Sequence, residues 1–250
     1  MGTESTLPPL TPGTLYLVAT PIGNLEDITL RALRVLRECD VVAAEDTRRS
    51  GQLLRHFAIT KPLLSYFQFN EAKRSEEIIE RLRRGEKVAL VTDAGSPGIS
   101  DPGERVVRAA IAAGLRVEAV PGACALVAGL TASGLPAGEF HFIGFLPHKS
   151  GQRRNKLMSL AGFEGTLVLY ESPYRVEKLL AELEEVFPHR NVVLARELTK
   201  KFEEFLRGKP AELRAATAKR SLKGEFVALI GPALETEPAT NPNFTSSSPT

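Results

Sequence analysis

The sequence has no long apolar run, no leader-like beginning and no cysteine pattern typical of a metal or disulfide framework. No stretch approaches the roughly 18 apolar residues of a transmembrane helix. The beginning, MGTESTLPPL, has neither the basic nor the apolar region of a secretory signal. Cys39 and Cys124 sit in apolar surroundings at no recognised spacing. We therefore expect two buried free thiols in a cytoplasmic protein without membrane attachment.

Several ligand-binding motifs are absent too. No two of the 20 glycines lie two residues apart, which excludes the G-x-G of dinucleotide folds and of kinase glycine loops. Gly98 and Gly103 have the spacing of a P-loop, but Glu104 follows where that loop requires lysine. No glycine pair encloses a serine as in the G-x-S-x-G elbow. The four histidines are scattered, so no metal site is expected.

What remains is the composition of a globular protein, with 43% hydrophobic and 25% charged residues in 250. Residues 1–12 and 234–250 are rich in Pro, Ser, Thr and Asn and are expected to be disordered tails. The tails hold Glu4, Glu235 and Glu237 and no base. Removing these three negative charges raises the formal charge from +2 to +5, a mild hint of a polyanionic partner.

Strand-like and helix-like patterns alternate between the tails. In the first half, strands are predicted over 14–20, 40–45, 87–92 and 115–122, and helices over 30–39, 75–85 and 104–114. Asp27 or Thr29 is a plausible N-cap of the first helix, and Gly85 closes the second. This alternation predicts a mainly parallel sheet with helices on both faces.

The second half repeats this texture after a loop, a short strand and a basic segment. Strands are predicted over 165–172, 191–199 and 224–231, with 202–208 as a short strand or hairpin arm, and helices over 173–187 and 210–218. We therefore predict two α/β domains, over 13–122 and 141–233, joined by the connecting segment 123–140.

Four consecutive strands of the first domain end in turns of small or polar residues: TPIGN, AEDTR, TDAGSPGISDPG and VPGACA. Each turn alone is explained by ordinary turn chemistry. Together, at the carboxyl ends of strands in one open α/β sheet, they predict a ligand cleft.

Seven segments carry a family resemblance, in order and at matching distances. They are TPIGNLEDITLRAL, AEDTR, DAGSPGISDPG, VPGACAL, GFLPHKSG, YESPYR and ARELTKKFEEFLRG. Together they closely resemble the tetrapyrrole methylase superfamily of S-adenosyl-L-methionine (SAM) methyltransferases, over about residues 13–232. The resemblance implies two α/β domains with the cofactor cleft between them, a homodimer, and 2′-O-ribose methylation of a cytidine in the decoding region of 16S rRNA in the small ribosomal subunit.

The resemblance also implies the cofactor site. Glycine permits close approach of backbone to ligand, and SAM carries no phosphate that would need a lysine. The implied cofactor-binding residues are Pro21, Asp93, Ala94, Gly95, Ser96, Ile99, Cys124 and Ala125, with Tyr170 and Leu198 of the second domain closing over the adenine. For Ile99, Ala125 and Leu198, core packing is the competing interpretation.

Methyl transfer to a hydroxyl needs positioning and a base for the hydroxyl proton. The candidates are Glu45, Asp46, Asp101, Glu171, Glu197 and Lys200. We single out Asp46 with Arg48, and beside them Glu197 and Lys200, as catalytic residues. Asp101 is equally explained as the cap of a helix that starts at Gly103, and Glu171 and Glu197 as partners of Arg175 and Arg196.

Basic residues gather in HKSGQRRNK (148–156), which we expect to be a flexible RNA-contacting stretch. Lys149, Arg153, Arg154 and Lys156 would contact phosphates and make binding salt-dependent. Tyr66, Phe67 and Phe69 fit either stacking on a splayed base or the edge of a core. Two other functions stay open: a methyltransferase acting on a tetrapyrrole or another small molecule, and a non-catalytic ribosome-assembly factor.

Overall fold

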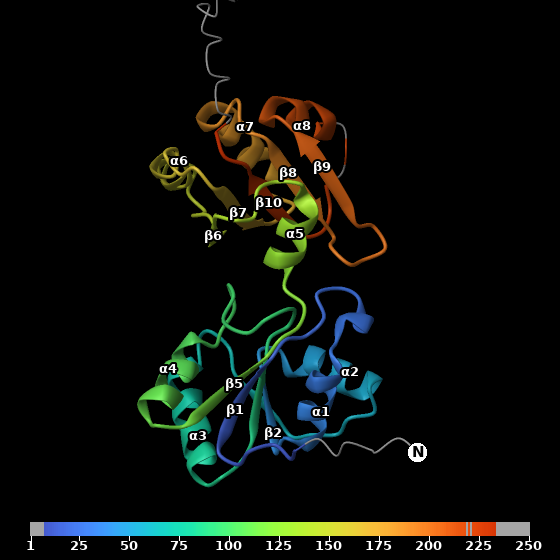
Figure 1. Cartoon of the computed structure of the whole chain (residues 1–250), viewed down its shortest axis with the longest axis vertical. Helices are drawn as coiled ribbons and strands as arrows, with labels where there is room; N and C mark the ends of the chain where they lie inside the picture. Colours follow the sequence, from blue (N-terminus) through green and yellow to red (C-terminus); the bar gives the residue numbers. More distant parts are fainter. Residues whose placement is uncertain (1–7, 219, 221, 234–250) are drawn as a thin grey trace, which may run out of the picture. The chain divides into compact units, whose positions relative to one another are not determined.

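The computed structural model describes residues 8–218, 220 and 222–233, which form two compact units (Figure 1). Unit 1 runs to Gly129 and also takes Glu197–Glu203, whereas unit 2 comprises Leu130–Arg196 and the chain from Glu204 onward. Of the two expected tails, only residues 8–12 belong to the described residues. Over the ranges that the structure describes, every helix is too short or too polar to span a membrane.

Unit 1 is built on a five-stranded sheet with the order β3-β2-β4-β1-β5. All four strand pairs are parallel, as predicted. The strands are short and mostly apolar because a parallel sheet is buried on both faces. They are β1 (Thr14–Val18), β2 (Val41–Ala44), β3 (Leu63–Ser65), β4 (Val88–Val91) and β5 (Arg116–Val120).

Helices cover both faces of this sheet, which confirms the predicted layering (Figure 1). α1 (Leu30–Glu38) and α2 (Thr47–His56) share one core with the sheet, and α3 (Glu71–Arg83) and α4 (Glu104–Ala112) share the other. A short 3-10 turn, η1 (Leu25–Asp27), precedes α1. The alternating inward residues of β1 divide between the two cores, with Tyr16 on one side and Leu15 on the other.

The ends of the helices follow local chemistry. Thr29 caps α1 by accepting a hydrogen bond from the Ala32 amide at 3.1 Å, one of the two caps predicted. Gly85 has φ +84° just beyond α3, a conformation that suits the glycine predicted to close it. The expected cap of α4 is wrong: Gly103 occupies the N-cap, and Asp101 makes no capping hydrogen bond.

Unit 2 contains a mixed sheet with the order β6-β7-β10-β8-β9. Only β6 and β7 run parallel; the other three pairs are antiparallel. β9 forms the predicted hairpin arm against β8. The strands are β6 (Phe140–Phe145), β7 (Thr166–Glu171), β8 (Val192–Arg196), β9 (Glu204–Gly208) and β10 (Phe226–Ile230).

Three helices build one continuous core with this sheet: α6 (Ser150–Ser159), α7 (Val176–Val186) and α8 (Pro210–Thr217). α7 contributes most, with Leu179, Leu180 and Leu183 fully buried. A further helix, α5 (Ala125–Ser133), crosses the residue at which the two units divide.

Four elements were not predicted: α2, β3, α5 and α6. α2 has few apolar residues and contains Gly51, so it shows almost no helical pattern of its own. It begins because Asp46 caps it through the Arg48 amide, and it is held because Leu54 is buried in the core. Tertiary contacts thus decided what the local pattern left open.

Candidate functional site

The loops that follow β2, β4, β1 and β5 meet at one edge of the unit 1 sheet. These four strands are neighbours in that order and all point the same way. Their carboxyl ends therefore lie side by side, as the sequence predicted for the four polar turns. The loop of residues 92–103, which we call the central loop, follows β4 in the middle.

On one side, the central loop is bonded to the turns after β1 and β5. Thr20 and Gly95 exchange two backbone hydrogen bonds of 2.9 and 3.0 Å. The Thr20 hydroxyl also donates to the Thr92 carbonyl at 3.1 Å, and the Ser96 hydroxyl donates to the Ala123 carbonyl at 3.2 Å. Thr20 and Ala123 were not among the predicted residues, although each directly adjoins one that was.

On its other side, the central loop is bonded to the turn after β2. The Asp93 carboxylate accepts the Asp46 amide at 3.0 Å and lies 3.3 Å from the Arg49 guanidinium. The Asp93 carboxylate therefore holds the neighbouring turn in place and is already bonded to two of its groups. The structure thus assembles three of the four predicted turns directly around the fourth.

The central loop has a backbone that glycine makes possible. Gly95, Gly98 and Gly103 have φ of +89°, +82° and +148°, and Ser100 joins them at +61°. A methyl group on Gly95 would approach Ile22 Cγ2 at 3.3 Å, whereas one on Gly98 would meet nothing within 4 Å. Gly95 is therefore closed in by Ile22 and bonded to Thr20, whereas the backbone at Gly98 is open.

Alanine at these two glycines should have graded costs. Gly98→Ala should lower the free energy of unfolding by about 1–2 kcal/mol through backbone strain alone, and Gly95→Ala should lower it further because of Ile22. Gly162→Ala, with an ordinary φ and open space, should be nearly neutral. Urea unfolding measures all three; a Gly95→Ala cost no larger than that of Gly98→Ala would contradict the packing argument.

The predicted cofactor residues fall into two groups. Pro21, Asp93, Ala94, Gly95, Ser96, Ile99, Cys124 and Ala125 all lie on the assembled turns of unit 1 or directly beside them. Ala94 and Ile99 are exposed, so core packing does not explain them. Tyr170 belongs to unit 2, where its ring packs edge-on against Phe142 and Phe145.

Leu198 lies on the segment Glu197–Glu203, which groups with unit 1. The sequence had assigned Leu198 to the second domain, so this assignment is wrong. Leu198 is buried there, which fits core packing. The segment lies against the turn after β1: a methyl group on Gly23 would clash with the Lys200 side chain and come within 2.9 Å of Thr199 Oγ1. Lys200 pairs with Glu197 at 3.0 Å.

This segment is conformationally strained. Glu197 and Thr199 have φ of +50° and +66°, which non-glycine residues rarely adopt. Such strain persists only where surrounding contacts impose it, and it clusters at functional sites.

Arg196, the expected partner of Glu197, pairs instead with Glu204 at 3.4 Å. The Glu171–Arg175 pair is as expected, at 3.1 Å.

Asp46, predicted to act with Arg48 as a catalytic residue, has electrostatics that favour positioning over proton acceptance. Its carboxylate accepts hydrogen bonds from the Arg48 guanidinium at 3.1 and 2.8 Å and from the Arg48 amide at 2.8 Å. These bonds, the guanidinium first, lower the pKa of Asp46 to about 2. A carboxylate so well satisfied is a weak base. Asp46 and Arg48 are instead a helix cap and its clamp.

Asp101 has the opposite character. Burial raises the pKa of its carboxyl to about 6, and the nearby Glu45 carboxylate adds to the effect, against a hydrogen bond from the Thr92 side chain. The pKa of Glu45 is raised as well, again mainly by burial. The carboxyl ends of β2 and β4 thus hold two half-buried carboxyls, and burial raises the pKa of both. Within the described ranges, no group of acidic, histidine and cysteine side chains is arranged to hold a metal ion.

The basic segment 148–156 is not a flexible stretch but forms most of α6. Arg153 is 2% exposed and bonded to the Glu182 carboxylate at 2.5 and 2.6 Å, so its predicted contact with RNA is wrong. Arg154 is exposed and pairs with Glu185 at 3.0 Å. Lys149 and Lys156 are exposed and fit the predicted role. The helical period turned Arg153 inward, which a reading of charge alone does not reveal.

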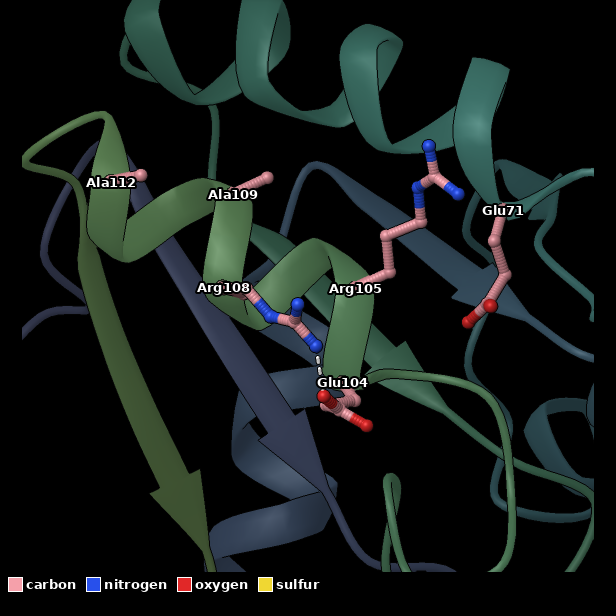
Figure 2. A pocket seen from close by; sticks show the side chains of 6 residues that line it. All are labelled: Glu71, Glu104, Arg105, Arg108, Ala109 and Ala112. Carbon is pink, nitrogen blue, oxygen red and sulfur yellow. Dashed lines mark hydrogen bonds and ion pairs between the residues drawn. The ribbon is translucent and has the colours of Figure 1, made fainter.

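A shallow hollow of about 570 Å³ lies elsewhere on unit 1, between α3 and α4 (Figure 2). Its charged groups are largely engaged: Arg108 pairs with Glu104, and Glu71 accepts the Gly103 amide at 3.1 Å. None of the predicted site residues lines it. We therefore place the candidate site at the strand ends and not in this hollow.

Comparison with known proteins shows which family the chain belongs to. Residues 14–214 match the family model of the Tetrapyrrole (Corrin/Porphyrin) Methylases. The chain belongs to this family. The match covers both units, including the Glu197–Glu203 segment, and confirms the resemblance carried by the seven sequence segments.

Two similar relatives carry the same name, and a solved structure with a similar fold carries another. The chain is 50% identical to ribosomal RNA small subunit methyltransferase I of Pseudomonas aeruginosa, over 87% of this chain and 78% of that protein. It is 48% identical to the protein of the same name from Halalkalibacterium halodurans, over 87% and 75%. Among solved structures, uroporphyrin-III-C-methyltransferase of Thermus thermophilus matches with a TM-score of 0.60 and 25% identity, over 88% and 94%.

Proposed function

We propose that this chain transfers a methyl group from SAM to a ribose 2′-oxygen of 16S rRNA, at a cytidine of the decoding region. The observation that carries the proposal is the identity of 48–50% with proteins named ribosomal RNA small subunit methyltransferase I. The exposed lysines of α6 support a polyanionic substrate.

The central loop and its neighbours are proposed to hold SAM. The backbone around Gly98 is open to a ligand, and Ser96 and Asp93 add polar side chains nearby. Ala94 and Ile99 offer exposed apolar surface for the cofactor. SAM, when bound, supplies an activated methyl group on a sulfonium, so the protein has only to position the acceptor and accept its proton.

Asp101 replaces Asp46 as the proposed base. Bound SAM would supply the methyl group to the ribose oxygen and keep the electron pair of the carbon–sulfur bond on sulfur, and Asp101 would accept the hydroxyl proton. A carboxyl with a pKa of about 6 is mostly ionised at neutral pH yet still basic enough to share a proton. Asp46 with Arg48, and Glu197 with Lys200, are proposed to position the turns around the reacting groups.

A tetrapyrrole substrate is the second candidate, favoured by the fold shared with uroporphyrin-III-C-methyltransferase. One assay with labelled SAM separates the candidates. Label in the RNA of small subunits from a strain lacking the enzyme supports the proposal, and label only in a tetrapyrrole supports the second candidate. Binding to the subunits without transfer would favour an assembly factor. Sizing by light scattering tests the proposed homodimer, and cell fractionation tests the proposed cytoplasmic location.

The lysines of α6 should govern the salt dependence of RNA binding. Lys149→Gln and Lys156→Gln should each make the negative slope of log affinity against log salt shallower by about 0.7–0.9, because each removes one phosphate contact. Lys73→Gln, an exposed lysine of unit 1, should leave the slope unchanged. Fluorescence anisotropy over a salt series measures it, and equal slopes for all variants would count against this surface.

A further inference from the structure

Tyr174 stands at the tip of a firmly held turn in unit 2. The Arg175 amide donates to the Ser172 carbonyl at 3.0 Å, which closes a four-residue turn with Pro173 second and Tyr174 third. Buried Glu171 holds both ends: it accepts the Ser172 amide at 2.8 Å and pairs with Arg175 at 3.1 Å. Although its turn is held at both ends, Tyr174 itself is 90% exposed.

The same turn is attached to the loop that leads into α6. Arg175 donates to the carbonyls of Leu146 and Pro147 at 2.8 and 3.2 Å, and its guanidinium lies 3.3 Å from His148 Nδ1. From the other side, Arg153 donates to the His148 carbonyl at 3.3 Å. Two arginines, each neutralised by a buried glutamate, thus fix this loop in place.

This arrangement joins the segment that carries an exposed aromatic ring to the segment that carries an exposed cation. Tyr174 and Lys149 are each one residue away from the Arg175–His148 contact, and both are exposed. We call Ser172–Arg175 and Leu146–Lys149 the clamped platform. We propose that the clamped platform binds an unpaired nucleotide of RNA, with its base stacked on Tyr174 and a neighbouring phosphate at Lys149.

This inference rests on the proposed function and names how its RNA substrate is held. A turn whose backbone is already held by hydrogen bonds loses less entropy when its aromatic side chain stacks on a base than a mobile loop would. Stacking on an aromatic side chain requires an unstacked base, so the platform selects single-stranded RNA over a duplex. The lysine adds attraction to the backbone without reading the sequence.

The test compares three variants with a short labelled single-stranded RNA and the duplex of the same sequence. Tyr174→Ala should weaken single-strand binding about tenfold, the effect of losing one stacked base, with an unchanged salt slope because no charge is lost. Tyr174→Phe, which keeps the ring, should bind as the wild type does. Lys149→Gln should instead make the dependence of log affinity on log salt less steep. Binding of the duplex should be the same for the wild type and both Tyr174 variants.

Three results would overturn the platform. Two are wild-type affinity of Tyr174→Ala for the single strand and an equal loss for strand and duplex. The third is weakening by Phe69→Ala alone, since Phe69 is an aromatic of unit 1 that is 89% exposed. Methyl transfer by the wild type is measured in parallel. Its absence would defeat the proposed function, whereas intact transfer with Tyr174-independent binding would defeat only the platform.

Discussion

Arg153→Ala should lower the free energy of unfolding by about 3–5 kcal/mol. The Arg153 side chain is 3% exposed and makes two hydrogen bonds to Glu182, whose side chain is 10% exposed. Removing the guanidinium leaves a buried carboxylate without its counter-charge, and it also frees the His148 carbonyl. The loss is therefore far greater than that of a surface charge.

Urea unfolding with matched variants measures this effect. Arg154→Ala, one residue along the same helix, breaks only the exposed pair with Glu185 and should cost less than about 1 kcal/mol. Arg153→Leu combined with Glu182→Leu should recover much of the lost stability, because no charge is then buried alone. Equal costs for Arg153→Ala and Arg154→Ala would show that the buried pair is not what holds α6 to α7.

Asp101→Asn should reduce methyl transfer by about 10²–10⁴-fold at neutral pH, the usual contribution of a general base. The amide keeps the size and the hydrogen bonding of the carboxyl but cannot accept the proton. SAM affinity, measured by calorimetry, should change little. Wild-type turnover should fall as the pH drops through about 6, because Asp101 becomes protonated.

The same substitution should stabilise the protein above pH 6. Burial raises the pKa of Asp101 from 3.8 to about 6, so the folded state holds this proton more tightly than the unfolded chain. The contribution of Asp101 to stability therefore declines as the pH rises from about 4 to about 6. Asn carries no charge, so the gain in melting temperature over wild type should be largest above pH 6 and vanish below about pH 4.

Asp46→Asn provides the contrast. The pKa of Asp46 is lowered to about 2 by Arg48, and its carboxylate caps α2. The Asp46→Asn variant should be less stable than the wild type at neutral pH, since a favourable charge is removed. Any loss of activity should result from the changed conformation of the turn that Asp46 caps. If Asp46→Asn abolishes transfer while Asp101→Asn leaves it intact, the base is Asp46 and the assignment to Asp101 is wrong.

The sequence determined the architecture of unit 1 apart from α2 and β3, because the signals of its other elements are local. Short apolar runs such as VALV fit only buried parallel strands, and their polar ends fall at one sheet edge by the geometry of that sheet. The motifs that carry the family resemblance also lie in these turns. Hence the sequence alone predicts a candidate site around Gly95, where the structure bonds the four turns to one another.

The tertiary structure alone decided the roles of the charged residues. Asp46 and Asp101 are both aspartates in polar turns, yet a neighbouring guanidinium lowers one pKa and burial raises the other. Arg153 and Lys149 lie in one basic run, yet the helical period and Glu182 bury only Arg153. Charge is written in the sequence, but solvation and partners are set by residues far along the chain, so acid–base and binding roles emerge only when the chain is folded.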